Sequence, residues 1–314
     1  MLGFNRSAAK IVSLPTPKMA VADLFRGISI ETAPGIAAKT ASYGAHLPAG
    51  TPVYITMLPG ADLGEIVATA ARLRGEGLVP VPHIAARSLA SRAQLDDYLR
   101  RLAGEAAVDQ VLVIGGGVST PAGPFDRTMQ VLETGLLQHH GVKTIGVAGH
   151  PEGSKDIPAE EVARAVAEKN AYARAAGTAM YIATQFCFDA EVIIAWDRDL
   201  RRAGNELPIH LGLAGPAKLK SLIHYAAMCG VGPSIRFLTR QAMNIARLAS
   251  VSVPDRLLTD LADYRMKDAG CGIAQLHLFA FGGLERSARW LGAMQDGRFT
   301  LDGRGGFAMD ETLD

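Results

Sequence analysis

The chain has 314 residues, of which 48% are apolar and 20% are charged, with 32 Lys and Arg against 31 Asp and Glu. This composition excludes an intrinsically disordered chain. The formal net charge of +1 supplies no attractive field for a phosphate backbone, so it argues against a nucleic-acid partner.

Short apolar segments rich in β-branched residues recur along the chain and predict eight strands. The predicted strands are Gly27–Glu31, Pro52–Thr56, Leu78–His83, Gln110–Ile114, Thr144–Ala148, Met180–Gln185, Ile209–Leu213 and Gln275–Phe279. Their apolar residues run continuously rather than in alternation, which is typical of parallel strands that are buried on both faces.

The segments between these strands carry helix start and stop signals. Predicted helices begin at Asp62 (with Glu65), at Ser91 (with Gln94), at Asp156 and Pro158, and at Asp189, and they end at Gly75, Gly104, Gly177 and Gly204 respectively. A further helix is predicted over Val253–Lys267, in the gap of about sixty residues between the seventh and eighth strands.

Eight strands that each precede a helix predict a (β/α)8 barrel, also called a TIM barrel. We expect one domain over residues 1–314, with an N-terminal extension (1–26), extra helices between strands seven and eight, and a tail (291–314) that is peripheral or poorly ordered. An open doubly wound sheet is the competing architecture, but it would need a glycine-rich dinucleotide turn after its first strand, and the sequence has none there.

The cysteines and the N-terminal segment bear on the compartment. Cys187, Cys229 and Cys271 lie far apart without a CxxC pair, so we expect neither a disulfide framework nor a metal site. The first twenty residues lack the apolar stretch of a signal peptide, and no run approaches the roughly 18 apolar residues of a membrane span. These features predict a cytoplasmic protein without a membrane partner.

In a parallel barrel the carboxyl ends of the strands converge on one mouth, where the chemistry is located. The residues at or just after the predicted strand ends are Glu31, Thr56, His83, Gly115–Gly117, Gly149–Glu152, Gln185, Gly212–Gly215 and Phe281–Gly283. They form a polar mouth on an apolar chain. Its glycine-rich loops would let backbone N–H groups approach a flat or phosphorylated ligand.

Each candidate also has a structural explanation. Glu31 could be a salt-bridged strand end, His83 a core histidine, Gly115–Gly117 a simple chain reversal, and Gln185 a residue that fixes a loop. Cys187 lies near the mouth, but no base is identified that would activate it as a nucleophile. The sequence contains no GxSxG, HExxH, P-loop or GxGxxG motif, so serine hydrolysis, metal hydrolysis and Walker-type phosphoryl transfer have no support.

Five segments, in order along the chain, resemble the methylenetetrahydrofolate reductase family. The segment Ala183-Thr-Gln-Phe-Cys-Phe-Asp189 is similar to the family's "ITQFFFD", and Gly146-Val-Ala-Gly-His-Pro-Glu-Gly153 is similar to "GVAGYPEG". Ile28-Ser-Ile-Glu31, Tyr54-Ile-Thr56 and Pro82-His83-Ile84 resemble "FSFE", "YVT" and "PHL". The family fold is a (β/α)8 barrel, in agreement with the strand count.

The resemblance implies an oxidoreductase of one-carbon metabolism that interconverts 5,10-methylenetetrahydrofolate and 5-methyltetrahydrofolate. Hydride would come from reduced FAD, which NADH or NADPH reduces, and the protein could be a homo-oligomer. By resemblance, Glu31 is the general acid toward N10, and Gln185 and Tyr225 bind the folate. The flavin-contacting positions correspond to Thr56, His83, Gly115, Gly116, Gly117, His150, Glu152 and Lys169.

The chain also departs from the family pattern. Gly115-Gly116-Gly117 stands where the family reads "RGD", so an aspartate near the flavin is replaced by Gly117, and His150 replaces a loop tyrosine. The "YTLNR" motif of the eighth strand reads Phe279-Ala-Phe-Gly-Gly283. Several alternatives therefore stay open: direct hydride transfer from NAD(P)H without flavin, a pterin-binding enzyme that transfers a methyl or one-carbon group without redox chemistry, and a non-catalytic folate-binding protein. The direction, toward methionine biosynthesis or toward recovery of methyl groups, is also open.

Overall fold

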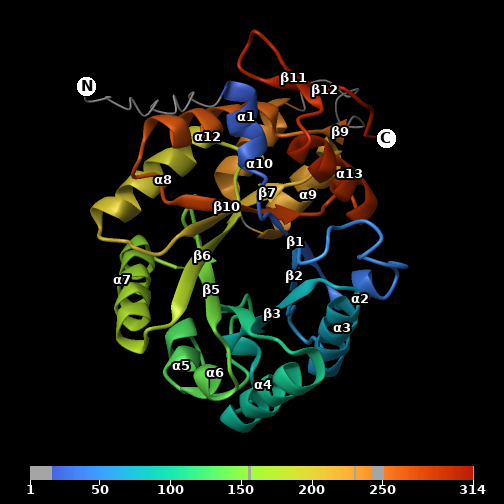
Figure 1. Cartoon of the computed structure of the whole chain (residues 1–314). Coiled ribbons are helices and arrows are strands. Elements are labelled where there is room, and N and C mark those ends of the chain that lie inside the picture. Colours follow the sequence, from blue (N-terminus) through green and yellow to red (C-terminus); the bar gives the residue numbers. More distant parts are fainter. Residues whose placement is uncertain (1–15, 155–156, 230, 242–250, 314) are drawn as a thin grey trace, which may run out of the picture.

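A computed structural model describes residues 16–154, 157–229, 231–241 and 251–313 of the chain. Eight parallel strands close into a barrel in the order β1-β10-β7-β6-β5-β4-β3-β2. The barrel strands are β1 (Ser29–Thr32), β2 (Pro52–Ile55), β3 (Val79–Ala85), β4 (Gln110–Ile114), β5 (Thr144–Gly149), β6 (Ala179–Phe186), β7 (Ile209–Ala214) and β10 (Ile273–Phe279). Figure 1 shows helices around the outside of these strands. The predicted (β/α)8 barrel is confirmed.

The helices between the strands begin largely where the sequence predicts. They are α2 (Pro34–Ala37), α3 (Leu63–Gly75), η1 (Ala86–Ser88), α4 (Arg92–Ala106), α5 (Thr128–Leu132), α6 (Leu136–His139), α7 (Ala159–Ala176) and α8 (Ala190–Arg202). Asp62, Ser91 and Asp189 cap α3, α4 and α8 by accepting hydrogen bonds from backbone N–H groups of the first turn. Pro158 is the N-cap of α7, whereas Asp156 lies outside the described residues.

The predicted end of α4 at Gly104 is wrong. The helix continues to Ala106 and ends at Ala107, which adopts a left-handed conformation with φ of 48°. Leu102 and Ala106 extend the buried stripe of this helix past the glycine. Burial of that stripe outweighs the modest cost of a glycine inside a helix.

The long connection between β7 and β10 contains the predicted extra helices. They are α9 (Leu219–Cys229), α10 (Gly232–Gln241) and α12 (Asp255–Lys267), together with a short antiparallel pair formed by β8 (Ala217–Lys218) and β9 (Val251–Ser252). None of the helices within the described residues is both long enough and apolar enough to cross a bilayer.

The first and last elements of the described chain lie on the same side of the barrel in Figure 1. Helix α1 (Pro17–Asp23), within the predicted N-terminal extension, packs against α12 and α13 (Leu284–Gln295). After α13, β11 (Phe299–Leu301) and β12 (Phe307–Met309) form an antiparallel pair with Phe299 and Phe307 buried. Of the two alternatives expected for the tail, poor order does not hold for β11 and β12, because burial of these two rings anchors them.

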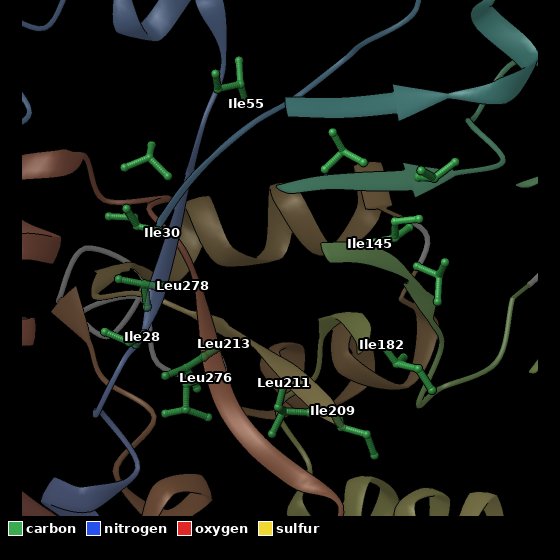
Figure 2. Packing of buried hydrophobic residues seen from close by; sticks show 14 of the residues in the cluster. Ile28, Ile30, Ile55, Ile145, Ile182, Ile209, Leu211, Leu213, Leu276 and Leu278 are labelled. Atoms are coloured by element: carbon green, nitrogen blue, oxygen red, sulfur yellow. The ribbon is translucent and has the colours of Figure 1, made fainter. Parts of the chain in front are cut away.

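The strands have two faces of different chemistry. Their outward side chains are aliphatic and pack beneath the helices in the main core, as Figure 2 shows for Ile30, Ile145, Leu211 and Leu278. The inward side chains form a small separate cluster made of Tyr54, Val81, Leu112, Tyr181 and Ala183. Polar and ionisable side chains fill much of the remaining interior, and they define the candidate site.

Candidate active site

The candidate site is centred on Glu31, near the carboxyl end of β1. One carboxylate oxygen, Oε2, lies 3.6 Å from Nε2 of His83 on β3 and 3.7 Å from Nε2 of His277 on β10. The Glu31 side chain is 19% exposed, while those of His83 and His277 are 8% and 2% exposed. The acid is therefore partly open to the mouth and is backed by two buried imidazoles.

Burial controls the protonation of His83. Burial lowers the pKa of His83 to about 4 although the nearby Glu31 raises it, and the neighbouring His277 also lowers this pKa. His83 is therefore neutral near pH 7. Its Nε2 has no hydrogen-bond partner among the described residues. Glu31 and His83 were both expected at the mouth, and the structure brings them together.

A set of interior polar residues lies beneath Glu31. Nδ1 of His277 is 2.9 Å from Oγ of Ser29, and the His277 ring packs on Tyr54 with centroids 4.3 Å apart. The phenol of Tyr54 lies 2.5 Å from that of Tyr181, whose ring stacks on His210 at 3.9 Å. Burial raises the pKa of both tyrosines, so both phenols keep their protons near neutral pH.

Gly146 makes room for this arrangement. A Cβ atom at this position of β5 would lie 2.6 Å from both Cζ and Oη of Tyr181. Only a glycine lets the tyrosine cross the barrel interior at this level. A residue in the "GVAG" segment thus determines where the tyrosine pair lies.

Five of the positions implied for flavin lie at the ends of the neighbouring strands β2, β3 and β4. Oγ1 of Thr56, just after β2, is buried without a hydrogen-bond partner among the described residues, as is Nε2 of His83 on β3. Gly115, Gly116 and Gly117 follow β4, and the space beside Gly115 and Gly117 is open. Gly116 has φ of +94°, which favours glycine. These unmet hydrogen-bonding groups beside an open backbone fit a planar polar ligand.

The remaining positions implied for flavin lie after β5 and on α7. Lys169 is 7% exposed, and its Nζ is 3.5 Å from the carbonyl oxygen of Ala148. Burial lowers its pKa to about 8 and, together with Lys169, lowers that of His150 to about 4. Glu152 instead accepts hydrogen bonds from the backbone N–H and the hydroxyl of Ser234 in the first turn of α10. The carboxylate of Glu152 thus has a structural partner.

The two residues expected to bind folate come from elements other than those around Glu31. Gln185 is half-buried on β6, and β7 and β10 lie between β6 and β1 in the order of the barrel strands. The register of β6 against β7 shifts between Ala183 and Phe186, next to Gln185. Tyr225, on α9, stacks on Phe281 with centroids 4.1 Å apart.

Sequence reasoning missed the residues behind Glu31: Ser29, Tyr54, Gln110, Tyr181, His210 and His277. None of them lies at the carboxyl end of its strand, and the carboxyl ends were the positions considered. A signal was available, because Ser29 and Glu31 are two residues apart and therefore lie on one face of β1. Within the described part of the chain, no group of three or more His, Cys, Asp or Glu side chains is placed to hold a metal ion.

No protein-family model matches the chain. Among solved structures, it is similar to an uncharacterised protein from Clostridium thermocellum that binds two copies of 5-methyl-5,6,7,8-tetrahydrofolic acid, with a TM-score of 0.54 and 13% identity over 90% of this chain and 98% of that one. At that identity the likeness shows a shared barrel fold. Two further solved structures are similar with a TM-score of 0.46 and 12% identity each. The carboxyl transferase domain of Rhizobium etli pyruvate carboxylase matches over 90% of this chain and 46% of its own. A GH18 chitinase from Pseudoalteromonas aurantia matches over 86% of this chain and 99% of its own.

Proposed function

We propose that the protein binds a reduced folate in the mouth of the barrel and interconverts 5,10-methylenetetrahydrofolate and 5-methyltetrahydrofolate by hydride transfer. The observation that carries this proposal is the carboxyl group of Glu31, half-buried and faced by two buried imidazoles. The family resemblance of the segment around Gln185 supports it. So does the barrel shared with a protein that binds 5-methyltetrahydrofolate.

The reaction needs an acid at one defined place. The one-carbon bridge between N5 and N10 accepts hydride only after its bond to N10 breaks, and that bond breaks when N10 takes a proton. Glu31 would give N10 this proton, and the resulting iminium carbon would accept the hydride. His83, which is neutral near pH 7 because burial lowers its pKa to about 4, places no positive charge beside Oε2. Gln185, whose amide offers donors and an acceptor, would hold the pterin edge.

The residues at the ends of β2 to β5 fit FAD in part. Thr56, His83 and the backbone of Gly115–Gly117 would hold the isoalloxazine ring, and the buried ammonium of Lys169 would face a phosphate. When bound, reduced FAD would supply the hydride, and NADH or NADPH would reduce the oxidised flavin again. Glu152 already accepts hydrogen bonds from Ser234, so we leave it out of this set. Gly117 replaces the aspartate that the family carries near the flavin, and the loss of that charge would make the flavin easier to reduce.

A second candidate function follows from the same departures. Because Gly117 has no carboxylate and Glu152 is already bonded within the protein, the barrel could bind folate without flavin. It would then take hydride directly from NAD(P)H, or it would transfer a methyl or one-carbon group without redox chemistry.

The visible spectrum of the purified protein separates these functions. Flavin bands near ~450 nm that bleach when 5-methyltetrahydrofolate is added under anaerobic conditions would support the flavin-dependent oxidoreductase. Folate-dependent oxidation of NADH or NADPH without such bands would support direct transfer. The absence of both would contradict the redox proposal.

Glu31→Gln tests the acid. We expect folate turnover to fall by at least about 100-fold, because the amide cannot give N10 a proton. Reduction of bound flavin by nicotinamide should stay within about two-fold of wild type. Glu65→Gln, which changes an exposed carboxylate on α3, is the matched control and should leave both rates unchanged. Normal folate turnover in Glu31→Gln would show that another group is the acid.

A further inference from the structure

A carboxylate in the loop after β5 is bonded to the start of α10. Oε2 of Glu152 accepts a hydrogen bond from the backbone N–H of Ser234 at 3.1 Å, and the Ser234 hydroxyl donates to the other oxygen, Oε1. Ser234 is the third residue of α10, so its N–H belongs to the first turn, where backbone donors have no partner within the helix. Both oxygens of Glu152 therefore hold this end of α10.

Ser234 also joins a third segment to this contact. Its hydroxyl oxygen accepts a hydrogen bond from the backbone N–H of Phe188, which follows β6, at 3.3 Å. Ser234 is 1% exposed, so the serine end of these bonds is shielded from water. Hydrogen bonds to an ionised group are stronger than those between neutral groups. The loop after β5, the segment after β6 and α10 thus meet at one buried hydroxyl.

The position of α10 determines that of α9, which carries Tyr225. The two helices pack against each other, and the backbone N–H of Val231 donates to the carbonyl oxygen of Ala226 at 3.2 Å. Tyr225 borders an apolar cluster that both helices share with the end of β6, and it stacks on Phe281. The buried members of this cluster include Phe186, Phe188, Leu222, Ala226, Val231 and Leu238.

We propose that Glu152 is a positioning residue for the folate and does not contact the cofactor. By holding the start of α10, it keeps α9 and Tyr225 in the place where the folate binds. The proposal rests on the proposed folate binding by Tyr225. It differs from the family resemblance, which puts Glu152 among the flavin-contacting positions.

Two physical arguments favour this role. Apolar contacts are non-directional, so the shared cluster alone leaves the helix pair free to shift, whereas two hydrogen bonds to one carboxylate fix both distance and direction. An ionised carboxylate is also an acceptor only. It would repel the phosphates of FAD, but it is attracted to the positive end of the α10 dipole.

Two variants test the contact from its two sides. In the purified full-length protein, Glu152→Gln and Ser234→Ala should each raise the Kd for 5-methyltetrahydrofolate at least five-fold, measured by calorimetry under anaerobic conditions. The Kd for FAD, measured separately by quenching of flavin fluorescence, should stay within two-fold of wild type. The double variant should stay within two-fold of the weaker single variant, because both changes disrupt one contact.

Thr239→Ala is the matched control, because it removes a hydroxyl of α10 that bonds to carbonyl oxygens of its own helix. It should leave both Kd values unchanged.

Several results would overturn the positioning role. One is an unchanged Kd for folate in both variants. Another is weaker FAD binding in Glu152→Gln while Ser234→Ala behaves as wild type, since that pattern identifies a cofactor contact. Equal losses of both affinities would indicate a merely structural role, and independent effects in the double variant would show that the two side chains do not act together. A wild type that binds no folate would instead overturn the proposed function.

Discussion

The outward and inward faces of the barrel strands differ in what they contribute. Along β7, Leu211 and Leu213 face the helices, whereas His210 faces the interior beside Tyr181. Along β1, Ile30 packs outward while Glu31 faces the two histidines. One apolar face is enough to fix the barrel against its helices, so the other face can hold polar groups that need partners.

Leu211→Ala should have the largest effect, because Leu211 is fully buried in the outward core seen in Figure 2. We expect a loss of about 3–5 kcal/mol in the free energy of unfolding, measured by chemical denaturation. Leu112→Ala, in the small inward cluster, should lose only about 2–3 kcal/mol, because water can enter a cavity that borders polar groups.

Leu58→Ala is the control for this pair. Leu58 is 58% exposed, so its truncation should change the free energy of unfolding by less than about 0.5 kcal/mol. If Leu112→Ala were as costly as Leu211→Ala, the inward face would also be a close-packed hydrophobic layer, and the contrast between the faces would fail.

The outward face was predictable from the sequence and the inward face was not. An apolar run such as Ile209–Leu213 indicates a strand regardless of which strands lie beside it. The number of strands, and from it the barrel, could therefore be predicted from the sequence. The cluster around Glu31 depends on the register of several strands, which pairs Ser29 with His277 and Glu31 with Tyr54. No local pattern gives that register.

Two further differences have the same physical origin. Burial of Ala106 carries α4 past Gly104, and burial of Phe299 and Phe307 orders the tail. Local signals predicted an end or disorder at these places, but contacts with distant segments decided the outcome. The bulge before Phe186 likewise changes the surroundings of Gln185 in a way that motif similarity could not predict.

Acid should act on the inward face through its neutral histidines. Burial lowers the pKa of His83 from 6.5 to about 4 in the folded protein. Between these two pH values the unfolded chain therefore binds more protons at His83 than the folded protein does. The contribution of His83 is therefore fully present above pH 6.5 and is lost as the pH falls toward 4. His150 and His210, with pKa values lowered to about 4, act in the same direction.

Denaturation of His83→Gln at pH 7 and pH 4.5 measures this effect. The loss of unfolding free energy between the two pH values should be smaller than in wild type by on the order of 2 kcal/mol. His46→Gln, which removes an exposed imidazole, should behave as wild type. An unchanged loss in His83→Gln would mean that His83 is not held neutral by burial.

Gly146→Ala probes the inward face by its geometry. The added Cβ would meet Tyr181 at 2.6 Å, so the tyrosine must move and its hydrogen bond with Tyr54 must weaken. We expect a loss of about 1–3 kcal/mol in the free energy of unfolding, typical of overpacking. Gly104→Ala is the matched control, because its Cβ meets nothing within 4 Å inside α4, and alanine there should stabilise by about 0.5–1 kcal/mol. If Gly146→Ala lowers and Gly104→Ala raises the free energy of unfolding, Gly146 is required by the tyrosine beside it. If Gly146→Ala leaves this free energy unchanged, the inward face can shift without cost.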